Sequence, residues 1–395
     1  MTAPVPSRRR VAGPLRGGRG RSGSAPLRVL VVGQAEGTPG GISSVQRLHV
    51  RFLDAREDVA VRVVTTYDEV GAARRLWLMT TGIARAVALV LGGRVDVVHL
   101  HVAKGLSALR KGLIVTVARL RGVPTVLHTH AGAFAEWFDG LPAPLRPVVA
   151  WLLRADRVIV LADGARETYT SRLGLAAERV PVVANPVEWP AELPPRDPHA
   201  SRVRGVFLGR LIDRKGVFDL IDAIASLHAE HRARLHVTLA GHGDVDAVHA
   251  AVAAAGLAGS VDVRSWIGPE ERDALLREAE LLLLPSWWEG LPMSVLEGMA
   301  WGLCPVVTPV GGLATLVRDG DNGVVVPVHD PAALGAALDK LLSDDDVRVQ
   351  LGARARESVA PFGADAWADR LVALYRELLV PDQLPDRHGR KSHHG

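Results

Sequence analysis

Two acidic residues, Glu289 and Glu297, have the residue type and the spacing to bind a sugar or a nucleoside. They lie in the segment 281–302, whose apolar start predicts a buried parallel strand and whose Pro292 suits the first residue of a helix. The unpaired N–H groups and the positive dipole end of that helix favour a phosphate. A carboxylate repels a bare phosphate, so the pair predicts a phosphate linked to hydroxyl-bearing groups. From the residues alone, two solvated charges at a helix end explain the pattern as well.

Two cations, Arg210 and Lys215, lie in the loop 209–216 (GRLIDRKG), which follows an expected strand at 204–208. Cations so spaced on a strand-to-helix loop can clamp a diphosphate and neutralise one that departs. The simpler interpretation of the bare pattern is that both side chains face solvent.

Two histidines, His101 and His130, each come just after an expected strand. Ligands gather at the carboxyl ends of strands in open α/β sheets, so either ring could meet a substrate. A histidine at a strand end is, without other information, more often a satisfied polar residue. Gly41, in a glycine pair after the first strand, would allow a substrate to approach the backbone closely, although a tight turn explains the pair equally well.

The glutamate pair within PSWWEGLPMSVLEGMAWG, followed by PVVTPVGG, resembles the donor site of retaining GT-B glycosyltransferases of family 4, the glycosyl transferases group 1. The resemblance runs from about residue 28 to 379. It implies an α/β fold in which two doubly wound, Rossmann-like domains face each other across a cleft. The departures from the family pattern, Gly298 and Cys304, replace no group that would carry charge or a proton.

The same resemblance assigns roles to single residues. His130 would approach the sugar near the reacting carbon, Arg210 and Lys215 would bind the leaving diphosphate, and Glu289 would hold hydroxyl groups of the donor sugar; these four are the expected catalytic residues. Glu297 would hold the ribose. The full set of expected substrate-binding residues is Gly41, Asn185, Gly209, Gly243, Trp266, Ile267, Gly290, Leu291, Pro292, Met293 and Glu297. We expect no metal site, because the cations and the helix dipole would neutralise the diphosphate and no D-x-D signature lies beside them.

The order of apolar and helical segments predicts two α/β halves. We expect an N-terminal, acceptor-side domain at 27–185, a proline-rich linker at 186–200 and a nucleotide-sugar-binding domain at 201–362. By the resemblance, a helix at 363–380 crosses back onto the first domain. Strands are expected at 27–33, 60–64, 95–100, 125–129, 158–161, 180–183, 204–208, 235–240, 261–264 and 281–284.

The charge distribution and the cysteine content indicate which segments are disordered and in which compartment the protein is expected. The formal net charge is +4, but seven arginines fall within the first 28 residues, so the remainder of the chain is slightly acidic. We expect the Arg-, Gly- and Pro-rich residues 1–26 and the residues 381–395 to be disordered. The single cysteine, Cys304, and the lack of a secretory signal or an apolar span predict a cytoplasmic protein.

Three segments of the N-terminal half, 74–94, 110–121 and 145–154, mix Arg or Lys with large apolar residues. Helices that face a protein core have this composition too. The functional alternative is a face that rests on an anionic membrane surface, at the inner face of the cell membrane.

The expected function is metal-independent, retaining transfer of a hexose from a nucleoside-diphosphate sugar to a hydroxyl acceptor, with no cofactor. The segments HLHVA…RK and HTHAG resemble those of transferases that build exopolysaccharide or other cell-surface glycans on lipid carriers, so a glycan or lipid-linked alcohol is the expected acceptor.

A GT-B phosphorylase or a nucleotide-sugar epimerase is the enzymatic alternative. The non-enzymatic alternative is binding of an anionic surface or nucleic acid through the Arg-rich tail. It leaves the donor-site segments unexplained, so we expect no nucleic-acid partner. The first strand is not followed by G-x-G-x-x-G, which argues against a nicotinamide enzyme.

Overall fold

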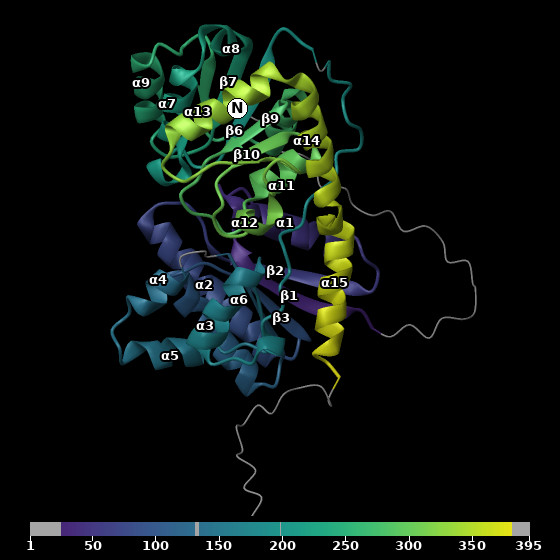
Figure 1. Ribbon diagram of the computed structural model, residues 1–395. Helices are drawn as coiled ribbons and strands as arrows, with labels where there is room; N and C mark the ends of the chain where they lie inside the picture. The colour runs from purple at the N-terminus through teal and green to yellow at the C-terminus, as the bar shows by residue number, and fades with distance from the viewer. Residues whose placement is uncertain (1–24, 131–133, 198, 381–395) are drawn as a thin grey trace, which may run out of the picture.

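Two parallel β-sheets, each flanked by helices, form the upper and lower halves of the protein (Figure 1). The computed structural model describes residues 25–130, 134–197 and 199–380. The N-terminal sheet has the strand order β2-β1-β3-β4-β5, and the C-terminal sheet has the order β11-β10-β9-β6-β7-β8. In each sheet the chain starts at an inner strand and builds outward in both directions. The α/β, doubly wound GT-B fold expected from the sequence is therefore confirmed.

Apolar runs form the inner strands, because both faces of a parallel sheet are covered by helices. The N-terminal strands are β1 (Leu27–Gln34), β2 (Val59–Tyr67), β3 (Val97–Val102), β4 (Thr125–Thr129) and β5 (Arg157–Ile159). The C-terminal strands are β6 (Val203–Leu208), β7 (Leu235–Ala240), β8 (Val261–Arg264), β9 (Leu281–Leu284), β10 (Cys304–Val307) and β11 (Val324–Val325). All four leucines of β9 are buried, which fixes the strand that leads into the glutamate-bearing segment.

The connections between strands are mostly helical. In the N-terminal half they are α1 (Gly41–Asp54), α2 (Ala72–Leu91), α3 (Leu106–Leu120), α4 (Phe134–Asp139), α5 (Leu145–Leu152), α6 (Asp163–Leu173) and η1 (Ala177–Arg179). In the C-terminal half they are η2 (Asp213–Lys215), α7 (Val217–Ser226), α8 (Ala229–Arg234), α9 (Val245–Ala254), α10 (Pro269–Glu278), α11 (Met293–Ala300), α12 (Leu313–Leu316), α13 (Pro331–Ser343), α14 (Asp345–Ser358) and η3 (Ala360–Phe362).

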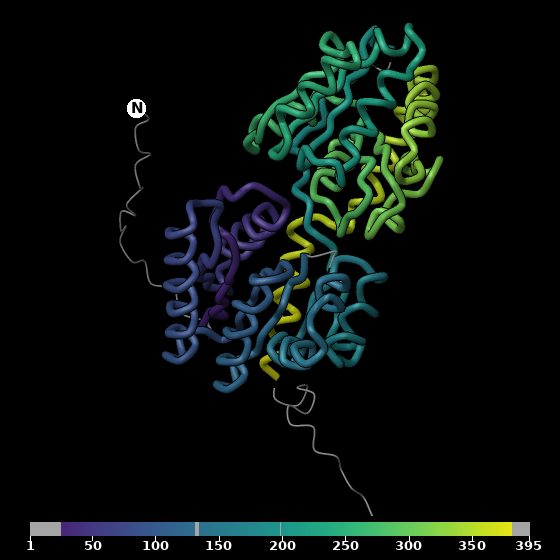
Figure 2. The backbone as a smooth tube through the Cα atoms, turned by 90° about the vertical axis from the view of Figure 1, so that its left-hand side faces the viewer, coloured from purple at the N-terminus to yellow at the C-terminus, as the bar shows by residue number. Residues whose placement is uncertain are grey.

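The last helix, α15 (Ala364–Glu377), leaves the C-terminal half and packs on the N-terminal sheet (Figures 1 and 2). Its buried stripe of Trp367, Leu371 and Tyr375 shares one apolar cluster with residues of β1 and α1. The helix therefore ties the two halves together, as the resemblance implied.

The expected strand at 180–183 is wrong. Only Val182 pairs, in an isolated bridge with Val160. Pro181 lies in the middle of the segment and has no N–H to donate to a ladder, which limits the pairing. The start of α11 also differs by one residue, because Pro292 is its N-cap and Met293 its first residue. The two expected disordered tails fall almost wholly outside the described residues. Within the described ranges no helix combines the length and hydropathy needed to cross a bilayer.

Candidate active site

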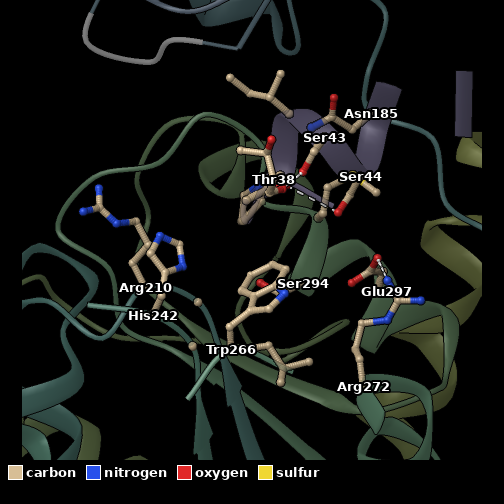
Figure 3. Close-up of a pocket in the computed structure, with 18 of the residues that line it drawn as sticks. Thr38, Ser43, Ser44, Asn185, Arg210, His242, Trp266, Arg272, Ser294 and Glu297 are labelled. Atoms are coloured by element: carbon tan, nitrogen blue, oxygen red, sulfur yellow. Dashed lines mark hydrogen bonds and ion pairs between the residues drawn. The ribbon is translucent and has the colours of Figure 1, made fainter. Parts of the chain in front are cut away.

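A cavity of about 500 Å³ lies between the two halves and receives residues from both (Figure 3). All the expected catalytic residues line it, and so do the expected substrate-binding residues except one. Those that line it are Gly41, His130, Asn185, Gly209, Arg210, Lys215, Trp266, Ile267, Glu289, Gly290, Leu291, Pro292, Met293 and Glu297. Residues spread over most of the chain thus converge on one place.

Gly243 is the exception, since it does not line the cavity. Its φ is 136°, and a Cβ there would lie 2.5 Å from the carbonyl oxygen of Leu211. The glycine instead permits close packing of this turn against the loop that carries Arg210. Its neighbour His242 lines the cavity, and burial, together with the charge of Arg210, lowers the pKa of that ring.

The loop that follows β10 makes hydrogen bonds to the turn between β9 and α11. The Thr308 hydroxyl donates to the carbonyl oxygen of Ser286, and the Gly312 N–H donates to that of Gly290 at 2.6 Å. Gly311 has φ 54°, and a Cβ there would lie only 2.1 Å from the carbonyl oxygen of Glu289. This small-residue loop therefore sets the position of the turn that presents the first glutamate.

Glu289 is a buried carboxylate paired with a cation, and its exposed fraction is 7%. Its Oε1 contacts Lys215 Nζ and accepts a hydrogen bond from the Ser286 hydroxyl at 2.8 Å. Both contacts use the same oxygen, which leaves Oε2 for a bound group. Lys215 ends the short helix η2, and Arg210 lines the cavity from the same loop.

Glu297 is also paired with a cation, as Figure 3 shows. Arg272 Nη1, from α10, donates to Glu297 Oε1 at 2.7 Å. Burial raises the pKa of the Glu297 carboxyl, and the Arg272 charge opposes that rise. The sequence did not reveal Arg272, because its helix lies on a different segment and only the fold brings it to Glu297.

The N-terminal half contributes polar groups to the opposite wall. His130 lies just after β4, and its Nε2 is 2.9 Å from His101 Nδ1. Burial, together with the charge of Lys111, lowers the pKa of His130 to about 3, so the ring is neutral. Asn185 donates from Nδ2 to the carbonyl oxygen of Leu291 at 2.7 Å, while its buried Oδ1 has no partner among the described residues.

The start of α1 also reaches the cavity, and sequence reasoning found only Gly41 there. An added Cβ at Gly41 would lie 3.8 Å from the Met293 side chain, so the starts of α1 and α11 approach each other across the cleft. Thr38, Ser43 and Ser44, from α1 and its preceding loop, also line the wall (Figure 3), and so does Arg47. Short hydroxyl residues in the loop before a helix and in its first turn resemble ordinary capping and loop positions, so nothing in the sequence indicated that these face a ligand.

Comparison with known proteins assigns the chain to a family. Residues 202–358 match the family model Glycosyl transferases group 1, and residues 39–188 match Glycosyltransferase Family 4. A D-inositol 3-phosphate glycosyltransferase of Catenulispora acidiphila is 32% identical over 337 residues, which make up 79% of this chain and 78% of the relative. The chain belongs to the group 1 glycosyltransferases.

One further relative by sequence and one solved structure are similar to this glycosyltransferase. An alpha-D-kanosaminyltransferase of Streptomyces kanamyceticus is 28% identical over 284 residues, covering 66% of this chain and 72% of the relative. The structure of HepE from Anabaena in complex with UDP-glucose has a TM-score of 0.71 and 18% identity, covering 89% of this chain and all of that one. At that identity the likeness shows the GT-B fold alone.

Proposed function

We propose that this glycosyltransferase moves a hexose from a nucleoside-diphosphate sugar to a hydroxyl acceptor, with retention of configuration at the anomeric carbon. The observation that carries the proposal is the grouping, in one cavity, of Arg210, the Lys215–Glu289 pair, Glu297 and the start of α11. The UDP-glucose found in HepE supports a donor of this class.

Each part of a nucleotide sugar has a matching group in this cavity. The diphosphate would lie between Arg210 and Lys215 and the free N–H groups at the start of α11, where positive charge neutralises the leaving group. Glu297 would accept the two hydroxyls of the ribose. Glu289 would accept hydroxyls of the sugar through Oε2, and His130 would reach the sugar from the opposite wall.

Metal independence is part of the proposal, and it is argued from charge. The carboxylates that face the expected diphosphate, Glu289 and Glu297, each contact a cationic side chain. Mg²⁺ is usually bound through one or two carboxylates together with substrate phosphates, and here Oε1 of each carboxylate already contacts a protein cation. The positive charge for the leaving group would therefore come from the protein itself.

The acceptor side suggests a lipid-linked or cell-surface glycan intermediate. Each of the helices α2, α3 and α5 packs on the core, as the simpler sequence interpretation held, through residues such as Val90, Ile114 and Val149. Other large apolar residues of the same helices face outward; Trp77 is 62% exposed and Leu120 is 79% exposed. The Arg119 guanidinium carbon lies 4.2 Å from the centre of the Trp151 ring, so a cation lies among these exposed apolar side chains. We name this set the basic–apolar face: Leu76, Trp77, Leu106, Leu113, Leu120, Leu145, Val148 and Trp151. The three helices lie side by side in Figure 1.

Exposed apolar side chains with arginines around them bind anionic lipid surfaces. We therefore place the enzyme in the cytoplasm, at the inner face of the membrane, where a lipid-linked acceptor would be held. Co-sedimentation with anionic vesicles at low salt tests this. Replacing Trp77 and Leu106 by serine should abolish it, whereas Val349→Ser, at an exposed apolar site on α14, should not. Binding that survives the double change but is lost on removal of residues 1–24 would assign the membrane contact to the tail instead.

Donor hydrolysis is the direct test of the proposed reaction. The purified enzyme is incubated with UDP-, GDP- and ADP-sugars, and one donor should be cleaved slowly to nucleoside diphosphate and sugar. Lys215→Ala and Glu289→Gln should each lose most of that turnover, while Lys340→Ala, an exposed lysine on α13, should keep it. Near-normal rates in both site variants would refute the assignment. Release of a sugar phosphate in the presence of inorganic phosphate, or conversion of one nucleotide sugar to its epimer, would favour the phosphorylase or the epimerase.

A further inference from the structure

A chain of buried hydrogen-bonding rings runs from the cavity to the crossover helix α15. His130 Nε2 lies 2.9 Å from His101 Nδ1, and His101 Nε2 lies 3.0 Å from His49 Nδ1. His49 Nε2 is 2.9 Å from the Tyr375 hydroxyl on α15. The proposed reaction uses only the first ring, so the others call for a separate explanation.

The chain continues beyond the tyrosine to a closed end. The Tyr375 hydroxyl is 2.7 Å from His99 Nδ1, and His99 Nε2 is 3.3 Å from His128 Nδ1. His128 Nε2 is buried and has no partner among the described residues. The sequence of contacts is therefore linear, with the cavity at one end and an unpaired nitrogen at the other.

The two links nearest the cavity have hydrogen-bond lengths and not the nitrogen–nitrogen separation of a zinc site. Two imidazole nitrogens bound to one tetrahedral zinc lie roughly 3.3 Å apart, because each Zn–N bond is about 2.0 Å. The His130–His101 and His101–His49 nitrogens are closer, at 2.9 and 3.0 Å. Burial lowers the pKa of all five rings, so each is neutral and carries a single N–H.

The proton positions on neutral rings in a linear chain depend on one another. An imidazole with one N–H donates on one side and accepts on the other, and a tyrosine hydroxyl can do both. Three arrangements satisfy every link. The first has five Nδ1–H rings and the second has five Nε2–H rings; the third has Nε2–H on the three rings before Tyr375 and Nδ1–H on the two rings after it, so that His49 and His99 both donate to the Tyr375 oxygen. The second leaves an N–H on His128 buried without an acceptor, the third leaves the Tyr375 O–H without one among these rings, and orphaned buried donors are the rarer case.

We propose that His101, His49 and Tyr375 are positioning residues that fix the ring and the tautomer of His130, with its proton on Nδ1. The Nδ1 of His130, the ring nitrogen that does not contact His101, is then a hydrogen-bond donor, suited to a hydroxyl oxygen of the donor sugar. Through Tyr375 the crossover helix contributes to the donor site without touching a substrate. The link to the sugar rests on the proposed function, whereas the tautomer of the free protein does not.

Ring ¹⁵N spectra of the full chain labelled at histidine test the proposal without any substrate. A protonated ring nitrogen and a bare one differ widely in shift, and single replacements assign the rings. We expect His49, His99, His101, His128 and His130 all to be Nδ1–H. A mixture of tautomers along the chain, or His130 as Nε2–H, would overturn the proposal. This outcome is independent of whether any nucleotide sugar is cleaved.

Tyr375→Phe tests the contribution of the crossover helix. Loss of one donating hydroxyl should shift the ring nitrogens of His49, His101 and His130 together and lower kcat for donor cleavage about 3- to 10-fold, the range of one hydrogen bond, with KM little changed. Tyr169→Phe is the matched control, because Tyr169 is a second buried tyrosine whose hydroxyl hydrogen-bonds the Thr129 side chain instead of a ring of the chain. It should leave the five rings and kcat unchanged. Equal effects of the two variants, or no shift at His130 in Tyr375→Phe, would contradict the positioning role.

Discussion

Acid should destabilise the N-terminal half before the C-terminal half, because five buried histidines are neutral in the folded protein. Burial lowers the pKa of His49 and His130 to about 3 and the pKa of His99, His101 and His128 well below 6.5. In the unfolded chain each titrates near 6.5. The unfolded state therefore binds more protons below that pH, and folding stability is lost as the pH falls.

The size of the loss follows from linkage. Between pH 7.5 and 5.5 a ring that stays neutral in the folded state and titrates near 6.5 when unfolded costs about 1.4 kcal/mol. Five such rings cost roughly 7 kcal/mol, comparable with the whole stability of a typical domain. The raised pKa of the Glu297 carboxyl acts in the opposite direction, but it is one group against five.

Native-state hydrogen exchange, corrected for the intrinsic pH dependence, localises the effect within the full chain. Amides of β3 and β4 should lose protection steeply between pH 7.5 and 5.5, while those of β7 and β9 serve as the internal reference. His128→Asn should reduce the loss by about one fifth, and His249→Asn, at an exposed site, should not change it. Equal pH dependence of the two sheets, or ring pKa values near 6.5 in the folded protein, would refute the reasoning.

Two further substitutions probe the donor site. Glu297→Gln should weaken nucleoside-diphosphate binding about 10- to 100-fold by calorimetry, because a charged hydrogen-bond acceptor is lost and Arg272 keeps only one of its two carboxylate partners, Asp273. Unchanged affinity would remove Glu297 from the ribose site. Gly311→Ala should lower both the melting temperature and donor cleavage, because its Cβ would meet the Glu289 carbonyl oxygen at 2.1 Å. Gly164→Ala, with nothing within 4 Å of the added Cβ, should lower neither, and similar losses in both variants would show a general alanine effect.

The sequence predicted best the features that depend on local pattern. The strands at 125–129, 235–240, 261–264 and 281–284 agree with the structure residue for residue. Three of them are mostly buried runs, and the strand at 261–264 is an edge strand with only Val261 buried; each lies between turn or loop residues, so periodicity and flanking chemistry suffice to define it. The loop cations and the glutamate pair were found for the same reason, since each group lies within one short segment.

Features that depend on tertiary contact were missed. Arg272 meets Glu297 from another helix, and Tyr375 meets His49 across 326 positions of sequence. Nothing in the spacing of residues along the chain records such contacts. Gly243 was wrongly predicted to bind substrate. A glycine that permits tight packing behind the cavity wall has the same local sequence pattern as a glycine that lines the cavity.

A crystal structure with the cognate nucleotide sugar, once the hydrolysis screen has identified it, tests the central claim most directly. We predict that the diphosphate oxygens lie within hydrogen-bonding distance of Arg210, Lys215 and the N–H groups at the start of α11. The ribose should meet Glu297, and the sugar should lie between Glu289 and His130. A donor bound outside this cavity, or with its diphosphate turned away from the Lys215 loop, would contradict the account.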